Sequence, residues 1–140
     1  MQTIVGKSMC SLRREKEAYK AMSNHNHTGS IWSNVPHDGA NRREGPGTHF
    51  EINKKLPAGT SLIVLCYTQS GDTQSWVAPG GHTYRSDAWD FVVTSDQDRG
   101  GYVADVLIDT GGEITHQLGT EGTCDALSRR LANPSDSSPG

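Results

Sequence analysis

The densest apolar run in the chain covers residues 61–67, which read SLIVLCY. Its length is typical of a strand, and it is rich in β-branched side chains. Pro57-Ala58-Gly59 stands just before it and has the composition of a tight turn. We therefore expect a strand at residues 61–67 that is entered through this turn.

Shorter apolar runs follow at residues 91–93, 102–108 and 114–116, separated by the Gly- and Asp-rich segments SDQDRGG and DTGGE. These runs are expected to be strands. A short edge strand is also expected around Ile31, Trp32 and Val35. Several short strands with Gly-rich turns predict an all-β domain, a small barrel or sandwich, instead of an α/β sheet.

Both ends of the chain are polar. Residues 11–22, SLRREKEAYKAM, contain strong helix formers and predict a short helix, with a frayed leader as the alternative because the apolar face is thin. The last residues fade into Pro, Ser and Gly, so we expect disorder after about residue 133. The predicted organisation is an extension at 1–36, a folded unit at 37–124 and a tail at 125–140.

Composition narrows the function classes. The 140 residues suit one domain, and a net charge of -3 gives no field that would recruit nucleic acid. The hydrophobic share of 33% is below the usual value of roughly 45%, so part of the chain is expected outside the core. No apolar stretch approaches the roughly 20 residues of a membrane span, and residues 1–10 lack the apolar region of a signal peptide. We expect neither nucleic-acid binding nor membrane insertion.

Cysteines and histidines give little support for a metal site. Cys10, Cys66 and Cys124 have no CxxC spacing, which leaves open one disulfide with one remaining thiol. The pair His25 and His27 supplies half of a metal site at most, and the other histidines are scattered. We expect no metal and no other cofactor.

Catalytic patterns are also missing from the sequence. The many aspartates lie mainly in turn compositions, where Asp is common for local hydrogen bonding. Nothing resembles a nucleophile with its base, a phosphate-binding glycine loop or a zinc-protease helix. The chain is expected to be non-enzymatic.

An ordered set of landmarks runs through the middle of the chain. NRREGPGT at 41–48 and LPAGT at 56–60 precede the apolar strand, Trp89 is followed by Val92, and GYV stands at 101–103. This order resembles a bacterial SH3-like (SH3b) domain, with its N-x-R-x-G-P-[SG]-T, L-x-x-G-[TD], W-x-x-V and G-[WY]-V segments. The resemblance covers about residues 37–124 and is closest in pattern to domains of actinobacterial secreted proteins.

The resemblance implies a small SH3-like barrel, a first turn at 45–47, a strand at 48–56 with His49 or Phe50 packed inward, and the central strand after it. The residues with implied structural roles are Gly45, Pro46, Gly59, Trp89 and Tyr102. A disulfide between Cys66 and Cys124 would tie the tail to the core and contribute about 4 kcal/mol by loop closure. Alternatively, Cys66 is a buried small hydrophobe.

The chain departs from the family pattern at two places. Ala40 and Arg42 flank Asn41 where the family carries apolar residues, so a weak first strand or an exposed Arg42 is expected. The connection from Cys66 to Trp89 is longer than the family's usual short loop, and such loops are often functional.

This long connection supplies the candidate ligand-binding residues. Aromatic faces beside a few polar groups are typical of a groove for a peptide or glycan. Alternatively, Trp76 and Tyr84 fold back to cover one open end of a small barrel. The candidate residues are Trp76, His82, Tyr84, Arg85 and Asp87.

SH3b domains commonly recognise cell-wall material. The resemblance therefore implies a non-catalytic recognition module for a bacterial cell-envelope ligand, peptidoglycan or wall peptide, outside the cell or in its envelope. The alternative is a small structural or accessory component of a phage particle that docks on a partner protein through residues 1–40. A third possibility is a native start upstream of residue 1, with a signal peptide there.

Overall fold

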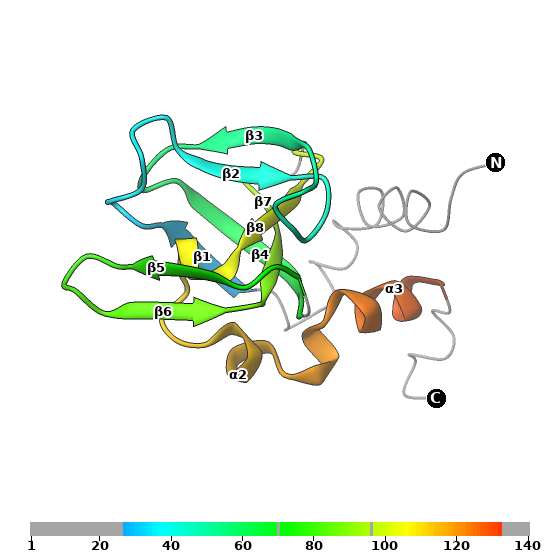
Figure 1. Cartoon of the computed structure of the whole chain (residues 1–140). Coiled ribbons are helices and arrows are strands. Elements are labelled where there is room, and N and C mark those ends of the chain that lie inside the picture. The colour runs from blue at the N-terminus through cyan, green and yellow to red at the C-terminus, as the bar shows by residue number, and fades with distance from the viewer. Residues whose placement is uncertain (1–26, 70, 96, 133–140) are drawn as a thin grey trace.

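The computed structural model describes residues 27–69, 71–95 and 97–132 (Figure 1). Seven strands form one antiparallel sheet in the order β3-β2-β8-β7-β4-β1-β9, and β5 pairs with β6 in a separate hairpin. The all-β class predicted from the sequence is confirmed. The strands are β1 (His27–Ile31), β2 (Ala40–Arg43), β3 (Ile52–Leu56), β4 (Ser61–Thr68), β5 (Gln74–Val77), β6 (Thr83–Ser86), β7 (Trp89–Val93), β8 (Gly101–Ala104) and β9 (Ile108–Asp109). The helices are η1 (Asp105–Leu107), α2 (Ile114–Leu118), η2 (Thr120–Gly122) and α3 (Cys124–Ala132).

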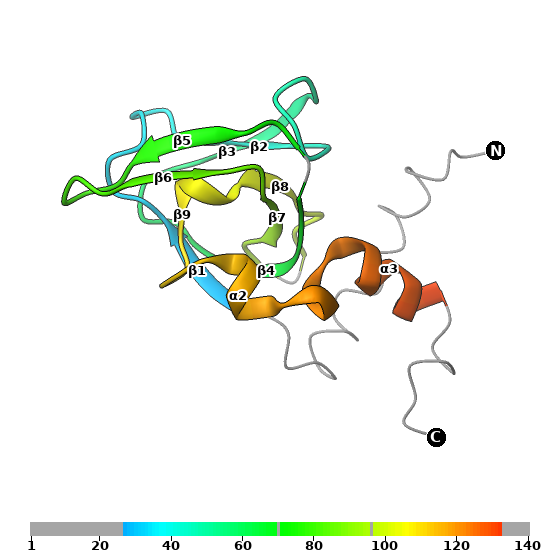
Figure 2. The ribbon, with the colours of Figure 1, turned by 60° about the horizontal axis from the view of Figure 1, so that its bottom comes forward.

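The sheet curls around a core and is buried on both faces at its centre (Figures 1 and 2). Every residue of β7 and β8 is buried, and successive side chains point to opposite faces. One apolar cluster therefore includes Val92 and Val103, and the other includes Phe91 and Tyr102, whose rings meet edge to face at 5.2 Å. Trp89 and Tyr102, for which the resemblance implies structural roles, are both buried.

The sequence predicted the central strands correctly, but it assigned strand to two later segments that differ in the structure. Strands β4 and β7 lie where the apolar runs predicted them. The run at 102–108 is not one strand, because β8 ends at Ala104 and the chain turns through η1 before β9 reaches β1. The strand expected at 114–116 was wrong, since these residues begin α2. Ile114 and Leu118, four residues apart, lie on one face of that helix and are both buried.

Strand β1 extends the folded unit upstream of the predicted boundary at residue 37. It pairs with β4 on one side and β9 on the other, so it is not an edge strand. Its only fully buried side chain is Ile31, which explains why the polar sequence HTGSI gave a weak signal. The helix expected at 11–22 and the tail after residue 133 lie outside the described residues.

Helix α3 occupies residues that the sequence assigned to the tail. Cys124, at its first residue, is disulfide-bonded to Cys66 of β4, with the two Cα atoms 4.8 Å apart. Leu127 is buried in the cluster that contains Phe91 and Tyr102. The predicted disulfide is therefore present, and it fixes the C-terminal helix against the sheet.

The turn at residues 45–47 is present, but the strand after it is shorter than expected. Gly47 donates its backbone N–H to Gly45, and β3 begins only at Ile52. His49 is exposed and Phe50 is half-buried. An added Cβ at Gly45 would lie 2.5 Å from the Phe50 ring, so the close approach of this ring requires glycine at that position.

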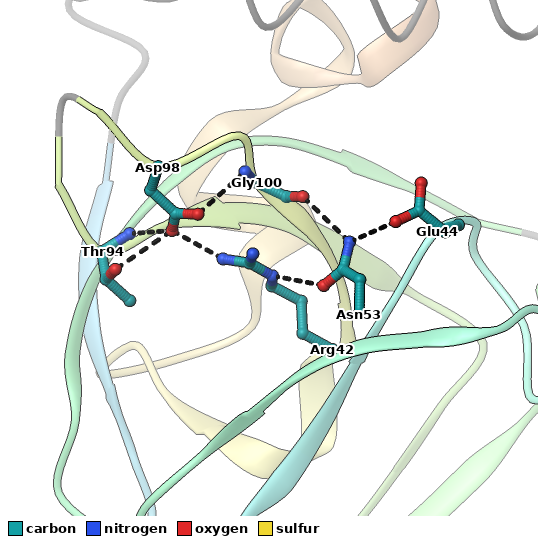
Figure 3. A network of polar contacts seen from close by, with 6 residues as sticks. All are labelled: Arg42, Glu44, Asn53, Thr94, Asp98 and Gly100. Carbon is teal, nitrogen blue, oxygen red and sulfur yellow. Dashed lines mark hydrogen bonds and ion pairs between the residues drawn. The ribbon is translucent and has the colours of Figure 1, made fainter.

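Arg42 is buried, so of the two expectations for this stretch, a weak first strand or an exposed Arg42, the exposed arginine was wrong. Only 2% of it is accessible, and its guanidinium donates to Asp98 at 2.6 Å and to Asn53 at 2.9 Å (Figure 3). Asp98 also accepts from Thr94 and from the backbone N–H of Gly100. A charged side chain is tolerated in a protein interior when such partners compensate its lost hydration. The network joins β2, β3 and the β7–β8 connection.

Partial burial of Asp98 acts to raise its pKa, but the hydrogen bonds from Arg42, Thr94 and Gly100 outweigh that effect. They hold the pKa of Asp98 well below its usual range. Both carboxylate oxygens of Asp98 accept hydrogen bonds from the protein, as expected for a carboxylate with a structural role.

Candidate functional site

The long connection between β4 and β7 forms the β5–β6 hairpin. Trp76 pairs with Tyr84 across the two strands, and a turn at residues 79–82 joins them. The hairpin lies over η1, and its tip points away from α3 (Figure 2). Its place over the end of the curled sheet gives it one face toward η1 and one face toward solvent.

Aromatic and amide contacts anchor the hairpin to the segment after β1. The indole N–H of Trp76 donates to Asn34 at 3.0 Å, and the Asn34 amide donates to the carbonyl of Val77 at 2.8 Å. Trp32 stacks on Tyr84 with ring centroids 5.9 Å apart and donates its indole N–H to Val106 of η1. Trp32 thus connects the hairpin to η1.

A cleft of about 490 Å³ opens between β6, η1–β9 and the segment that leads into α2. This volume is within the roughly 300–1,000 Å³ of small-ligand sites. Its lining combines the Trp32 and Tyr84 rings with four carboxyl side chains and one guanidinium. The charged lining residues are Asp87, Asp105, Asp109, Glu113 and Arg85.

The structure brings together three of the five candidate ligand-binding residues. Tyr84, Arg85 and Asp87 line the cleft, whereas Trp76 and His82 do not. Trp76 is half-buried and packs against both apolar clusters, as in the alternative in which it covers the sheet. His82 lies at the turn with its ring edge-on to Tyr84, at 4.4 Å. Whether any of them binds a ligand stays a prediction.

Sequence reasoning missed the opposite wall of the cleft. Trp32 was assigned only to a short strand, and Asp105, Asp109 and Glu113 were read as turn residues or not singled out. The sequence did contain one usable signal, because three carboxyl residues within nine positions flank the Gly111-Gly112 turn. Their assembly opposite Tyr84 depends on the packing of the hairpin over η1.

The rim of the cleft at residues 109–113 is held by hydrogen bonds. The carbonyl of Thr110 accepts from Gln117 at 2.7 Å and from the His27 ring at 2.8 Å. Gly111 has φ +85°, which favours glycine, and donates its backbone N–H to Asp109. These hydrogen bonds fix the conformation of the rim.

A buried pair of carboxyl groups lies at the inner end of the cleft. Asp90 of β7 is 0% exposed, and its carboxyl group meets that of Asp105, which lines the cleft. In the described chain, no N–H or other donor group reaches either oxygen of Asp90 or the Oδ1 atom of Asp105. Two unpaired carboxylates cannot both stay ionised in such a site, so the pair holds a proton.

Burial raises the pKa of Asp90 well above its usual range, and the adjacent Asp105 raises it further. Burial also raises the pKa of Asp105, although a hydrogen bond from Asp90 acts in the opposite direction. Glu113 raises the pKa of Asp105 and His27 lowers it. Both pKa values are raised, so the two carboxyl groups share a proton, and Asp105 is the member of the pair that lines the cleft.

Over the described ranges, no three His, Cys, Asp or Glu side chains are grouped closely enough to hold a metal ion. The helices of the same ranges are all too short or too polar to cross a bilayer. Comparisons with protein-family models, with curated proteins and with solved structures found no match to this chain. The candidate site must therefore be interpreted from its own geometry.

Proposed function

We propose that this chain is a non-catalytic recognition module that binds a bacterial cell-envelope ligand, peptidoglycan or wall peptide. The observation that carries the proposal is the cleft between β6 and η1–β9, where stacked Trp32 and Tyr84 rings lie beside charged and polar groups. The landmarks that resemble SH3b domains add support, because that family includes wall-binding modules.

The chemistry of the cleft suits an extended polar ligand. Aromatic faces pack against sugar rings or peptide planes, and neighbouring side chains fix the orientation through hydrogen bonds. Among the described strands, β6 pairs with β5 alone, and Tyr84, Arg85 and Ser86 of β6 line the cleft. A peptide could add to such an edge as a further strand.

The buried carboxyl pair favours binding over catalysis. General acid–base chemistry on two carboxyl groups requires both groups to approach the reacting bond. Asp90 is fully enclosed, so Asp105 is the one member of this pair that lines the cleft. A bound molecule would therefore meet one member of the pair and not both, which suits recognition better than catalysis by the pair.

Co-sedimentation with purified cell walls tests the proposal. Wild type is compared with Tyr84→Ala, which removes a ring from the cleft, and with Val77→Thr, which changes an exposed side chain of the same hairpin outside the cleft. We expect saturable binding by wild type and Val77→Thr and weaker binding by Tyr84→Ala. Absence of binding to actinobacterial and unrelated walls would overturn the proposal and favour the phage-component alternative.

A further inference from the structure

The Asp90–Asp105 pair differs from the partly buried Asp98 in its hydrogen bonding. The oxygens of Asp98 accept from Arg42, Thr94 and Gly100, so its charge is fully compensated within the protein. Asp90 and the Oδ1 atom of Asp105 receive no such donor. These unpaired oxygens are themselves buried, so the feature that a ligand in the cleft meets is the carboxyl group of Asp105 at its inner end.

The surroundings of Asp105 favour a cationic donor. The cleft lining carries Asp87, Asp109 and Glu113 in addition to Asp105, so a positive group entering it meets several carboxyl groups. Arg85 is the basic side chain in that lining, and its guanidinium is directed to the Ser75 hydroxyl at 3.4 Å, on the neighbouring strand. An anionic ligand would be repelled by this lining.

The aromatic wall favours the same kind of group. Trp32 and Tyr84 stand in the cleft with part of their ring surface available, and Tyr84 is 36% exposed. A cation over such a face is stabilised by the ring electrons. A divalent metal ion fits less well, because metal sites need three or more protein ligands, and the described part of the chain groups no such set.

Resting on the function proposed above, we propose that the cleft recognises a primary ammonium group of its ligand, with Asp105 as the direct acceptor and the buried Asp90 behind it. The ammonium group then lies beside the Asp105 carboxyl group, among the other carboxyl groups of the cleft lining. The ligand class is an amine-bearing peptide or an amino-containing wall polymer, with its cation at Asp105 and its adjoining part along Trp32 and Tyr84.

The first test uses the tripeptide Ala-Lys-Ala with both ends capped, compared with the same peptide carrying Nε-acetyl-lysine. Binding is followed by ¹⁵N–¹H NMR at the amides of Gly111 and Gly112 and at the Trp32 indole. We expect saturable shifts with the free amine and none with the acetylated peptide. Equal shifts with both peptides, or none with either, would overturn the ammonium assignment.

Three single substitutions test whether amine binding depends on the charge of Asp105 or only on a correctly folded cleft. Asp105→Asn can still hydrogen-bond Asp90 but has lost its charge, and we expect it to weaken amine binding at least about tenfold. Glu113→Gln reduces the rim charge without entering the buried pair, and a weaker loss is expected. Glu51→Gln makes the same charge change on an exposed residue outside the cleft and should bind as wild type. Unchanged affinity in folded Asp105→Asn would contradict the proposal.

N-acetylation of the cell walls distinguishes failure of this inference from failure of the proposed function. Loss of wall binding after acetylation is the expected result. Equal binding to native and acetylated walls would leave the recognition function standing and remove the ammonium site. Binding of the free-amine peptide without binding to any wall would keep the ammonium site and remove the envelope function.

Discussion

The Trp32 ring stacks on the Tyr84 ring with an interplanar angle of 24°, and this contact joins the segment after β1 to β6. Trp32 is fixed from behind by its indole hydrogen bond to Val106, while Tyr84 is 36% exposed. The pair therefore has one anchored ring and one accessible ring. Its position makes it the aromatic wall of the cleft and also a connection between two parts of the fold.

Tyr84→Ala should affect binding more than folding. Loss of one stacked, partly exposed ring is expected to lower the free energy of unfolding by about 1 kcal/mol. Loss of a ring at the centre of a binding site is expected to weaken wall binding about tenfold. Urea unfolding and co-sedimentation measure the two effects, with Val77→Thr as the control. A large loss of stability with unchanged binding would assign Tyr84 a purely structural role.

Asp98→Asn should strongly destabilise the protein. The substitution leaves the Arg42 charge buried without its carboxylate partner, for which we expect a loss of about 3 kcal/mol or more. Arg99→Gln breaks an ion pair between Glu44 and a half-exposed arginine and should cost less than about 1 kcal/mol. Urea unfolding at neutral pH compares the two variants. Similar small losses in both would show that the network of Figure 3 contributes little to stability.

The lowered pKa of Asp98 predicts that the folded protein loses stability in acid. Its pKa is lower in the folded state than its usual 3.8, so its stabilising effect is present above that value and is lost as the pH falls below it. Wild type should lose stability between about pH 4 and pH 2 more steeply than Asp98→Asn. Thermal unfolding at several pH values measures the slopes. Equal slopes would contradict the structural role of the ionised carboxylate.

Asp90 should affect stability at higher pH with the opposite sign to Asp98. Replacing it in Asp90→Asn should therefore change how the free energy of unfolding depends on pH. The pKa of Asp90 is raised in the folded state. Its contribution to the stability of the folded protein is therefore fully present below the pKa of 3.8 that it has in the unfolded chain. That contribution is lost as the pH rises through the pKa of the folded state. The titratable groups that act on the Asp90–Asp105 pair from outside are Glu113 and His27, and Asp90 in turn raises the pKa of Tyr67, which burial also raises. Asp90→Asn removes the buried acid and retains its shape.

The comparison for Asp90 is made between about pH 4.5 and pH 7.5, where Asp98 is ionised in both the folded and unfolded states. Wild type should lose more free energy of unfolding over this interval than Asp90→Asn. The variant should be at least as stable as wild type at the upper pH. Parallel pH profiles would show that Asp90 does not hold a proton in the folded protein.

The Cys66–Cys124 disulfide should contribute measurably to stability because it fixes α3 to β4. Replacing both cysteines with alanine is expected to lower the free energy of unfolding by about 2–5 kcal/mol. Cys10→Ser is the control, since it removes a thiol without removing the bond. Mass spectrometry of native protein under non-reducing conditions should find the 66–124 linkage. Two free thiols there would remove the chemical support for an extracellular location.

Local patterns predicted the centre of the fold and failed where long-range contacts decide the structure. Residues 61–68 form β4, where a strand was expected at 61–67, because the uninterrupted apolar run from Leu62 to Tyr67 suits a strand buried on both faces. Residues 114–116 also contain β-branched side chains, yet they form helix because Ile114 and Leu118 are both buried by the sheet. Arg42 is buried because Asp98, 56 positions away, supplies its partner.

The same distinction applies to the candidate site. Tyr84, Arg85 and Asp87 were found because aromatic and charged residues stood together in a long connection. Trp32 and Asp105 belong to separate segments, and their place in the cleft follows from the packing of the β5–β6 hairpin over η1. A single sequence carries no direct signal for such a contact. The hydrogen-bonding state of Asp90 is likewise visible only in the folded chain.

The most direct test of the account is to map solubilised cell-wall fragments onto the protein by ¹⁵N–¹H NMR. The cleft between β6 and η1–β9 predicts shifts at Tyr84, Gly111 and Gly112 and at the Trp32 indole, with the exposed face of β3 unaffected. Saturable shifts at these positions would support a recognition module that binds in this cleft. Shifts confined to another surface, or no shifts at saturating fragment concentration, would contradict it.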